Sequence, residues 1–279
     1  MRLRVALAQI STRIGDLEGN KEKHLSYIRL AKREGADLVV FPELSLTGYL
    51  LKDLAYEVPK HCAAAIQELA SECIDTYAVV GFVHEVRPGI VCNAAAVLGQ
   101  GKVRCIVPKF YLPTYGLFEE GRYFKPGDPL RDLKVVDAGF GTFGVLICED
   151  LWHPEPAEAL ALMGAEVIIC IASSPLRGLN RPIGGRPWID HAWSALTASA
   201  ALMYGVHVVF VNRAGHEDEE FFWGGSRIVA PDGVERCSCS IMDEDFKICE
   251  IDLSENTRAR RFSSFRIHLR DFHRALARL

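Results

Sequence analysis

Four side chains able to do chemistry stand directly after apolar runs that are typical of buried strands. Glu43 follows LVVFP, Lys109 follows VRCIVP, Cys148 follows FGVLI and Asn212 follows VHVVFV. Functional side chains of α/β proteins gather at the carboxyl ends of strands, so these positions are the first candidates for a site. A cysteine thiolate can attack a carbonyl carbon, a partly desolvated glutamate can move protons, and a lysine ammonium can stabilise a negatively charged oxygen.

Each of these residues also has a purely structural interpretation. Most buried cysteines are small core residues, as Cys170 inside its apolar run is expected to be. Glu43 could cap the next segment, and Lys109 could be a surface lysine that ends an edge strand. When each residue is considered alone, its structural and its functional interpretation both stay open.

The elements that must position these residues alternate between strands and helices. Strands are expected over 4–10, 36–43, 76–86, 91–99, 102–109, 140–150, 165–173, 206–212, 225–233 and 246–253. Helices are expected over 20–33, 59–74, 155–164 and 187–204, with Asn20 as the N-cap of the first. Gln100-Gly101 predicts a hairpin. This order indicates an α/β protein with mixed sheets covered by helices.

Composition argues against several classes of partner. The net charge of −4 over 279 residues disfavours nucleic acid and anionic membranes, and no apolar run is long enough to span a bilayer. An odd count of nine cysteines without a secretory signal predicts reduced thiols and a cytoplasmic location. Cys237 and Cys239 lack a second ligand pair, and the run 216–220 is expected to be a solvated loop near the site or an interface. We therefore predict no metal and no cofactor.

Three longer segments resemble the motifs of the nitrilase superfamily, in the order of that family. They are FPELSLTGYLLKDL (41–54), PKFYLPTYGLFEEGRYFKPGD (108–128) and CEDLW (148–152). The separations also fit, with 66 residues from Glu43 to Lys109 (109 − 43) and 39 from Lys109 to Cys148 (148 − 109). Within this superfamily the sequence is most similar to the glutaminase domain of glutamine-dependent NAD synthetases, through SLTGY, LPTYGLFEEGRYF and VNRAGHEDEEFFWGGS (211–226).

The resemblance implies a fold and an activity. The expected fold is a four-layer α-β-β-α sandwich with two mixed sheets over residues 1–257. The arginine-rich tail 258–279 is expected to be solvated or to contact a neighbour in a homo-oligomer. The expected reaction is thiol-dependent hydrolysis of a small amide, with glutamine or a similar ω-amide favoured, through a cysteine thioester.

The resemblance also implies roles for individual residues. The family's Glu-Lys-Cys triad corresponds to Glu43, Lys109 and Cys148. The second glutamate, beside the lysine, corresponds to Glu120, with Glu119 as the alternative. Expected substrate contacts are Tyr115, Phe118, Glu149 and either Ser173 or Ser174. Packing or capping roles are expected for Trp152, His153, Trp188, His191 and Trp193.

One departure from the NAD synthetases leaves the function open. The sequence ends at Leu279 and holds no SGGxDS-like loop of an ATP-using domain. We therefore expect either a free-standing amidase or a glutaminase subunit that supplies ammonia to a separate synthetase. A nitrile hydrolase is a further alternative, and the complete triad disfavours a binding protein without catalysis.

Overall fold

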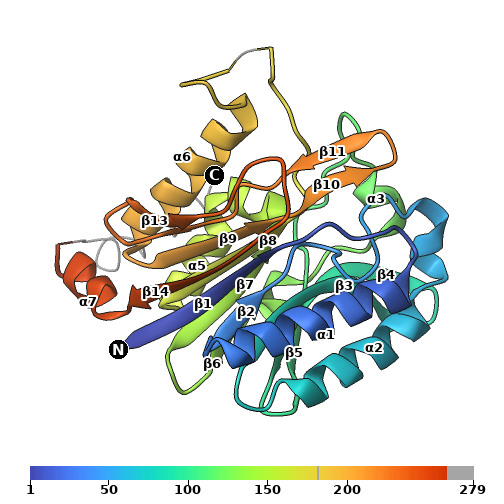
Figure 1. The fold of residues 1–279 in the computed structure, drawn as a ribbon, viewed down its shortest axis with the longest axis horizontal. Helices are drawn as coiled ribbons and strands as arrows, with labels where there is room; N and C mark the ends of the chain where they lie inside the picture. Colours follow the sequence, from blue (N-terminus) through green and yellow to red (C-terminus); the bar gives the residue numbers. More distant parts are fainter. Residues whose placement is uncertain (181, 263–279) are drawn as a thin grey trace, which may run out of the picture.

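Two six-stranded mixed sheets lie face to face in the computed structural model, which describes residues 1–180 and 182–262 (Figure 1). The first sheet has the order β14 (Asp245–Asp252), β1 (Arg2–Gln9), β2 (Leu38–Val40), β3 (Tyr77–Arg87), β4 (Ile90–Gly99) and β5 (Lys102–Pro108). The second has the order β13 (Glu235–Ser238), β12 (Arg227–Val229), β9 (His207–Asn212), β8 (Val167–Ala172), β7 (Thr142–Ile147) and β6 (Val135–Asp137). A separate hairpin is formed by β10 (Ala214–Glu217) and β11 (Glu220–Trp223).

Each sheet has a parallel centre and antiparallel edges. Strands β1, β2 and β3 are parallel, while β14, β4 and β5 pair antiparallel at the two sides. Strands β7, β8 and β9 are likewise parallel, with β6, β12 and β13 antiparallel. The parallel strands direct their carboxyl ends to one edge of the molecule, which is where the candidate residues lie.

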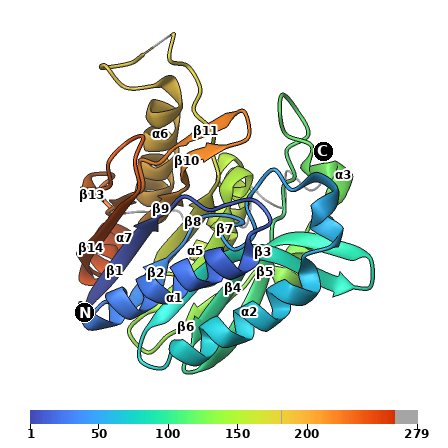
Figure 2. The same cartoon turned by 45° about the vertical axis from the view of Figure 1, so that its right-hand side comes forward.

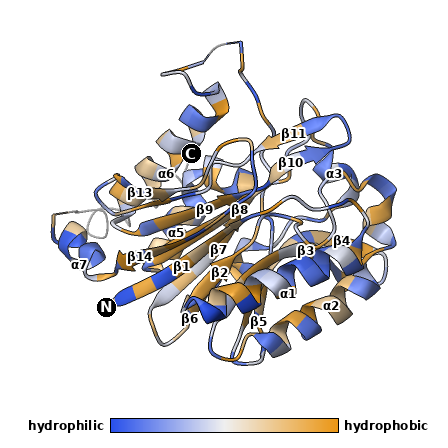
Figure 3. Cartoon of the chain, viewed as in Figure 1, coloured by the Kyte–Doolittle hydropathy of each residue, from blue (hydrophilic) through white to orange (hydrophobic). Residues whose placement is uncertain are grey.

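Helices cover the outer faces, and this confirms the four-layer sandwich. Helices α1 (Leu17–Arg33) and α2 (Pro59–Glu72) lie on the first sheet, and α5 (Pro154–Leu162) and α6 (Trp188–Tyr204) on the second (Figures 1 and 2). The strands of both sheets are largely apolar, whereas α7 (Ser254–Arg261) is largely hydrophilic (Figure 3). Side chains between the sheets and beneath the helices are almost fully buried, because this arrangement removes both faces of each sheet from water.

Shorter helical turns lie near the carboxyl edge and position the candidate site. They are η1 (Lys52–Tyr56), α3 (Glu120–Tyr123), α4 (Pro129–Asp132) and η2 (Cys148–Trp152). No helix within residues 1–180 and 182–262 is long and apolar enough to cross a membrane. Only residues 258–262 of the predicted tail are among those described; residues 258–261 belong to α7, and Phe262 follows its end.

Several local expectations need correction. Asp16 caps α1 by accepting a hydrogen bond from the Gly19 N–H, while Asn20 is buried one turn inside the helix. Strand β2 ends at Val40, before Pro42, which has no N–H to donate to a sheet. Cys237 on β13 and Cys249 on β14, edge strands of the two sheets, are paired with Cα atoms 6.4 Å apart, whereas reduced thiols were expected for all nine cysteines.

Helix α1 contains a buried histidine that should make stability depend on pH. His24 Nδ1 lies 2.7 Å from the Asn20 carbonyl oxygen and Nε2 lies 2.9 Å from the Ser45 hydroxyl. Burial lowers the pKa of His24 from 6.5 to about 4. Between these values the unfolded chain binds a proton that the folded chain does not, so stability present above pH 6.5 is lost as pH falls toward 4.

We expect His24 to account for about 3 kcal/mol of unfolding free energy lost between pH 7 and pH 4. Urea unfolding at both pH values would measure this loss. In His24→Gln the pH dependence should be weaker, whereas the exposed His61→Gln should retain it. Equal pH dependence in the two variants would contradict the assignment to His24.

Candidate active site

Cys148 occupies a sharp turn between β7 and η2. Its backbone has φ of +47°, a region that non-glycine residues rarely adopt and that occurs often at functional sites. The turn is held by Asp150, whose Oδ2 accepts the Ile147 N–H at 3.0 Å. The side chain of Cys148 is 7% exposed and lines a cavity of about 390 Å³. Cys148 is therefore a buried residue that also borders a pocket.

Lys109 lies directly after β5, between two buried carboxylates. Its Nζ is 2.6 Å from Glu43 Oε1 and 2.6 Å from Glu120 Oε1, and none of the three side chains is more than 5% exposed. The surface-lysine interpretation is therefore wrong. Glu120, rather than Glu119, is the glutamate beside the lysine, because Glu119 is exposed.

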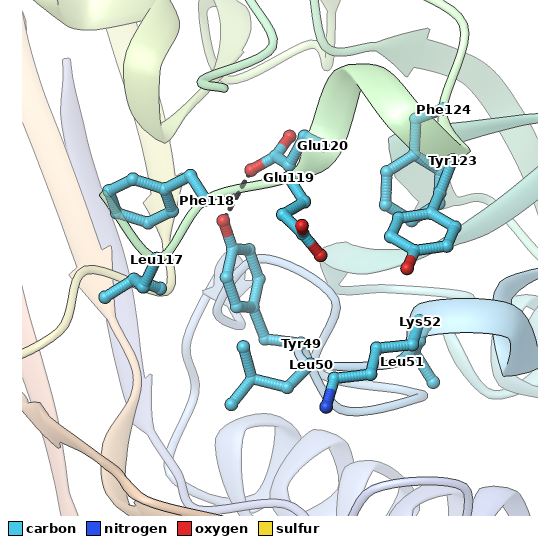
Figure 4. Close-up of a pocket in the computed structure, with 10 residues that line it drawn as sticks. All are labelled: Tyr49, Leu50, Leu51, Lys52, Leu117, Phe118, Glu119, Glu120, Tyr123 and Phe124. Carbon is cyan, nitrogen blue, oxygen red and sulfur yellow. Dashed lines mark hydrogen bonds between the residues drawn. The ribbon is translucent and has the colours of Figure 1, made fainter. Parts of the chain in front are cut away.

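Two further side chains complete this polar cluster. Asn93 of β4 donates from Nδ2 to Glu43 Oε1 at 2.7 Å and to Glu120 Oε2 at 3.4 Å. The Tyr49 hydroxyl donates to Glu120 Oε1 at 2.5 Å, as Figure 4 shows. Sequence reasoning missed both residues, since Asn93 lies in the middle of an apolar strand and Tyr49 in a turn.

The electrostatics of the cluster favour a charged lysine and a protonated thiol. Burial alone would lower the pKa of Lys109, but Glu120 and Glu43 outweigh it and hold the pKa well above its usual value. Burial and then Glu43 raise the pKa of the Cys148 thiol, although Lys109 opposes this. Burial raises the pKa of Glu120 to about 7. The thiol therefore needs a base before it can act as a nucleophile.

Asp150 links the segments that carry Lys109 and Cys148. Its Oδ1 accepts the backbone N–H groups of Phe110 at 3.0 Å and Tyr111 at 2.8 Å, while Oδ2 accepts that of Ile147. One buried carboxylate thus ties the residues after the lysine to the residue before the cysteine. Burial raises the pKa of Asp150 to about 7.

The two serines after β8 have different surroundings. Ser173 is fully buried, and its N–H donates to Glu43 Oε2 while its hydroxyl donates to the Glu43 carbonyl oxygen, both at 2.8 Å. Ser174 lines the cavity at Cys148 and accepts a hydrogen bond from Trp193 Nε1 at 2.9 Å. Asn212 accepts the Ser174 N–H at 2.8 Å, so it supports this turn from behind.

The remaining predicted contacts lie on the wall of the same cavity. Tyr115, Phe118 and Glu149 all line it, and the Tyr115 hydroxyl donates to Glu149 at 2.8 Å. Sequence reasoning missed the guanidinium of Arg177, which also lines it. The other lining residues include Trp152, Trp188 and Trp193, for which packing or capping was expected.

A second, smaller cavity of about 60 Å³ has Glu119 and Glu120 among its lining residues (Figure 4). Glu119 extends into it, beside Tyr49 and Tyr123, and Cys148 does not line it. Both glutamates thus border this cavity, and Glu120 is the one that contacts Lys109.

The run 216–220 forms the tip of a hairpin, where His216, Asp218 and Glu219 are exposed as expected for a solvated loop, but Glu217 is not. Its residues belong to the hairpin β10–β11, and Glu217 is only 4% exposed. Glu217 Oε1 accepts the N–H groups of Tyr49 at 2.8 Å and Leu50 at 2.7 Å, and Oε2 lies 2.6 Å from Arg213. The hairpin therefore holds the backbone of the tyrosine that binds Glu120.

Gly81 of β3 leaves the space that the segment around Glu43 occupies. A Cβ added at Gly81 would collide with the Leu44 nitrogen and the Pro42 carbonyl oxygen, which are backbone atoms. We expect Gly81→Ala to displace Glu43 and to lower kcat for the proposed amide hydrolysis by about 100-fold, as misplaced catalytic groups do. Gly89→Ala strains an exposed turn, because Gly89 has a φ of +75°, but its Cβ meets nothing within 4 Å and it should retain kcat. Equal kcat in both variants, measured by ammonia release, would contradict this role.

Comparison with known proteins places the chain in a family. The sequence profile of the carbon-nitrogen hydrolases matches residues 4–261, so the chain belongs to the carbon-nitrogen hydrolase family. The fold is shared with a carbon-nitrogen hydrolase from Helicobacter pylori (TM-score 0.87, 23% identity, 99% of both chains). It is also shared with an amidase from Nesterenkonia sp. (TM-score 0.82, 22% identity, 98% of this chain and 96% of that chain).

Higher sequence identity is found with larger enzymes. A glutamine-dependent NAD(+) synthetase of Thermotoga maritima is 35% identical over 263 residues, which cover 92% of this chain and 43% of that protein. The structure of a glutamine-dependent NAD+ synthetase from Acinetobacter baumannii has a TM-score of 0.80 at 31% identity, over 92% of this chain and 47% of that chain. The chain thus spans less than half the length of these synthetases.

Proposed function

We propose that this protein hydrolyses a small primary amide to a carboxylic acid and ammonia, with Cys148 as the nucleophile. The observation that supports this most directly is that Cys148 lines a cavity and lies within electrostatic reach of a lysine held between Glu43 and Glu120. Family membership supports the same reaction class.

In the proposed first half-reaction, Glu43 takes the proton of the Cys148 thiol as sulfur attacks the amide carbon. The Lys109 ammonium and the Glu149 N–H stabilise the negative charge that forms on the carbonyl oxygen. Glu43 then gives the proton to the nitrogen, the C–N bond breaks, and ammonia leaves a thioester on Cys148.

In the second half-reaction, Glu43 accepts a proton from water as its oxygen attacks the thioester carbon. The C–S bond breaks, the acid is released, and the proton returns to the sulfur. Glu120, Asn93 and Ser173 hold Lys109 and Glu43 in place by the contacts described above.

We propose glutamine or a similar ω-amide as the favoured substrate. Glu149 and Arg177 line the same cavity as the thiol, and the ammonium and carboxylate of an amino acid can bind them in place of their present partners, Tyr115 and Glu220. Ser174 is the better-placed of the two serines for a substrate contact. The similarity to glutamine-dependent NAD synthetases agrees with this choice.

The proposal is tested by measuring both the ammonia released and the acyl intermediate on the protein. Purified protein would be mixed with glutamine, asparagine, simple aliphatic amides and the matching nitriles, and ammonia would be measured. Mass spectrometry of the quenched protein should find an acyl adduct on the peptide that contains Cys148. Release from nitriles alone would favour the nitrile hydrolase, and no ammonia from any compound would refute the proposal.

A second candidate is a glutaminase subunit that supplies ammonia to a separate NAD synthetase. It is favoured by the 35% identity to a glutamine-dependent NAD synthetase over less than half of that protein. A partner that co-purifies and raises glutaminase activity would support it. Full activity of the isolated chain would favour the free-standing amidase.

We also propose a homo-oligomer formed through the outer faces of α5 and α6. Large apolar side chains there are about half exposed, namely Leu162, Met163, Leu202 and Met203. Such apolar surface is typical of subunit contacts. Light scattering would give the mass, and a monomer at micromolar concentration would contradict this proposal.

A further inference from the structure

The cavity at Cys148 has an aromatic wall that the amide chemistry does not use. Trp152 is 37% exposed and Trp188 is 43% exposed, and both line the cavity together with the buried Trp193. Indole rings that line a cavity and remain partly exposed offer apolar surface that a ligand can cover with a favourable change in free energy. They indicate an apolar part of the ligand.

Two of the three rings of this wall, those of Trp193 and Trp152, are held by contacts within the protein. The Trp193 ring is held by its Nε1 hydrogen bond to Ser174 Oγ and by stacking on Phe210, with ring centroids 4.4 Å apart. Trp152 packs edge to face on Trp193, with ring centroids 5.6 Å apart and an angle of 77° between the ring planes. A ring that enters the cavity therefore meets aromatic surfaces that need little reordering, which favours binding.

The charges of the cavity are already paired within the protein. Glu149 accepts a hydrogen bond from the Tyr115 hydroxyl, and its other oxygen lies 3.6 Å from His153. Both terminal nitrogens of Arg177 donate to Glu220, at 3.0 and 3.3 Å. An uncharged acyl chain can thus enter without leaving a charge unpaired, so the cavity does not require an amino acid head group.

We propose that the cavity binds an aromatic ring on the acyl side of the amide, so that its substrates include primary amides whose acyl chain ends in an aryl group. This inference rests on the proposed amide hydrolysis. The volume of about 390 Å³ lies in the range of small-molecule sites. The ring covers Trp152 and Trp188 while the carbonyl carbon faces the Cys148 sulfur.

The test compares two uncharged amides that differ by one phenyl group, butanamide and 4-phenylbutanamide. Their kcat/KM values would be measured by ammonia release. The wild-type protein should favour the phenyl compound by about tenfold or more. Trp188→Ala and Trp152→Ala should each bring this ratio close to one. Tyr56→Ala, which removes a half-exposed aromatic ring outside the cavity, should retain the wild-type ratio.

The milder variant Trp188→Leu is measured as well, and the thermal unfolding of each protein is recorded. These data distinguish the loss of a contact with the phenyl ring from the unfolding of the variant. A folded Trp188→Leu protein with a reduced ratio supports the inference. Two results overturn this inference alone. One is hydrolysis of butanamide or glutamine without preference for the phenyl compound, and the other is a ratio of kcat/KM values that is unchanged in all tryptophan variants. Absence of ammonia from every amide overturns the proposed function as well.

Discussion

Replacing Cys148 by alanine is expected to lower kcat for amide hydrolysis by about 10⁴-fold or more, in line with the loss of a covalent nucleophile in other hydrolases. The variant should fold, because the side chain is small and borders a cavity. It should also lack the acyl adduct in mass spectrometry. Ammonia release after mixing with substrate is the direct measurement.

Cys170 provides a matched control for this experiment. It is a fully buried thiol on β8, and its Sγ lies 4.0 Å from the Cys148 carbonyl oxygen. Cys170→Ala removes a neighbouring sulfur without touching the cavity, so it should retain most of kcat. If Cys148→Ala stayed active, or if the adduct mapped to another residue, the proposed mechanism would be wrong.

The second large effect is expected for Lys109→Met, on stability as well as activity. Methionine keeps the length of the side chain but leaves Glu43 and Glu120 buried without a cation between them. Removing one partner from a buried ion pair costs about 3–5 kcal/mol. Urea unfolding at pH 8 should show this loss, and ammonia release should fall to background.

The destabilisation should shrink at acidic pH. Lys109 lowers the pKa of Glu120, which is about 7 in the wild-type protein, so in the variant this pKa rises, the carboxyl is protonated at pH 5.5, and the repulsion is relieved. Lys21→Met is the control, since Lys21 also contacts two carboxylates, Glu18 at 2.8 Å and Glu68 at 2.9 Å, but at the surface. Its effect should be much smaller. If both variants lost a similar unfolding free energy, burial of the Lys109 cluster would not be the cause of the effect.

The sequence predicts best where a local pattern and a family motif coincide. Apolar runs that end in one polar residue placed Glu43, Lys109 and Cys148 at strand ends, and the structure brings Glu43 and Lys109 into direct contact. The hairpin at Gln100-Gly101 was equally clear, since β4 and β5 flank it. Longer strands and helices were predicted to within a few residues because their apolar periodicity is unambiguous.

What was missed depends on contacts between distant segments. Asn93 carries no local signal, since a single amide in an apolar strand looks like any interruption, yet it bonds two carboxylates from other segments. Glu217 lies in an acidic run that is typical of a solvated loop. It is buried only because Arg213 and the Tyr49 backbone meet it. Such partners are visible only after folding.

The pairing of β1 with β14 has a consequence during synthesis. The first strand of the chain, Arg2–Gln9, is bordered on one side by Asp245–Asp252, close to the other end. At a translation rate of about 5–20 residues per second, β14 is synthesised roughly 12–50 s after β1. During that time the backbone N–H and C=O groups on that side of β1 have no partner strand. An uncovered strand side invites pairing with other chains. Nascent or truncated forms that end before residue 245 should therefore depend on chaperones far more than the finished protein does.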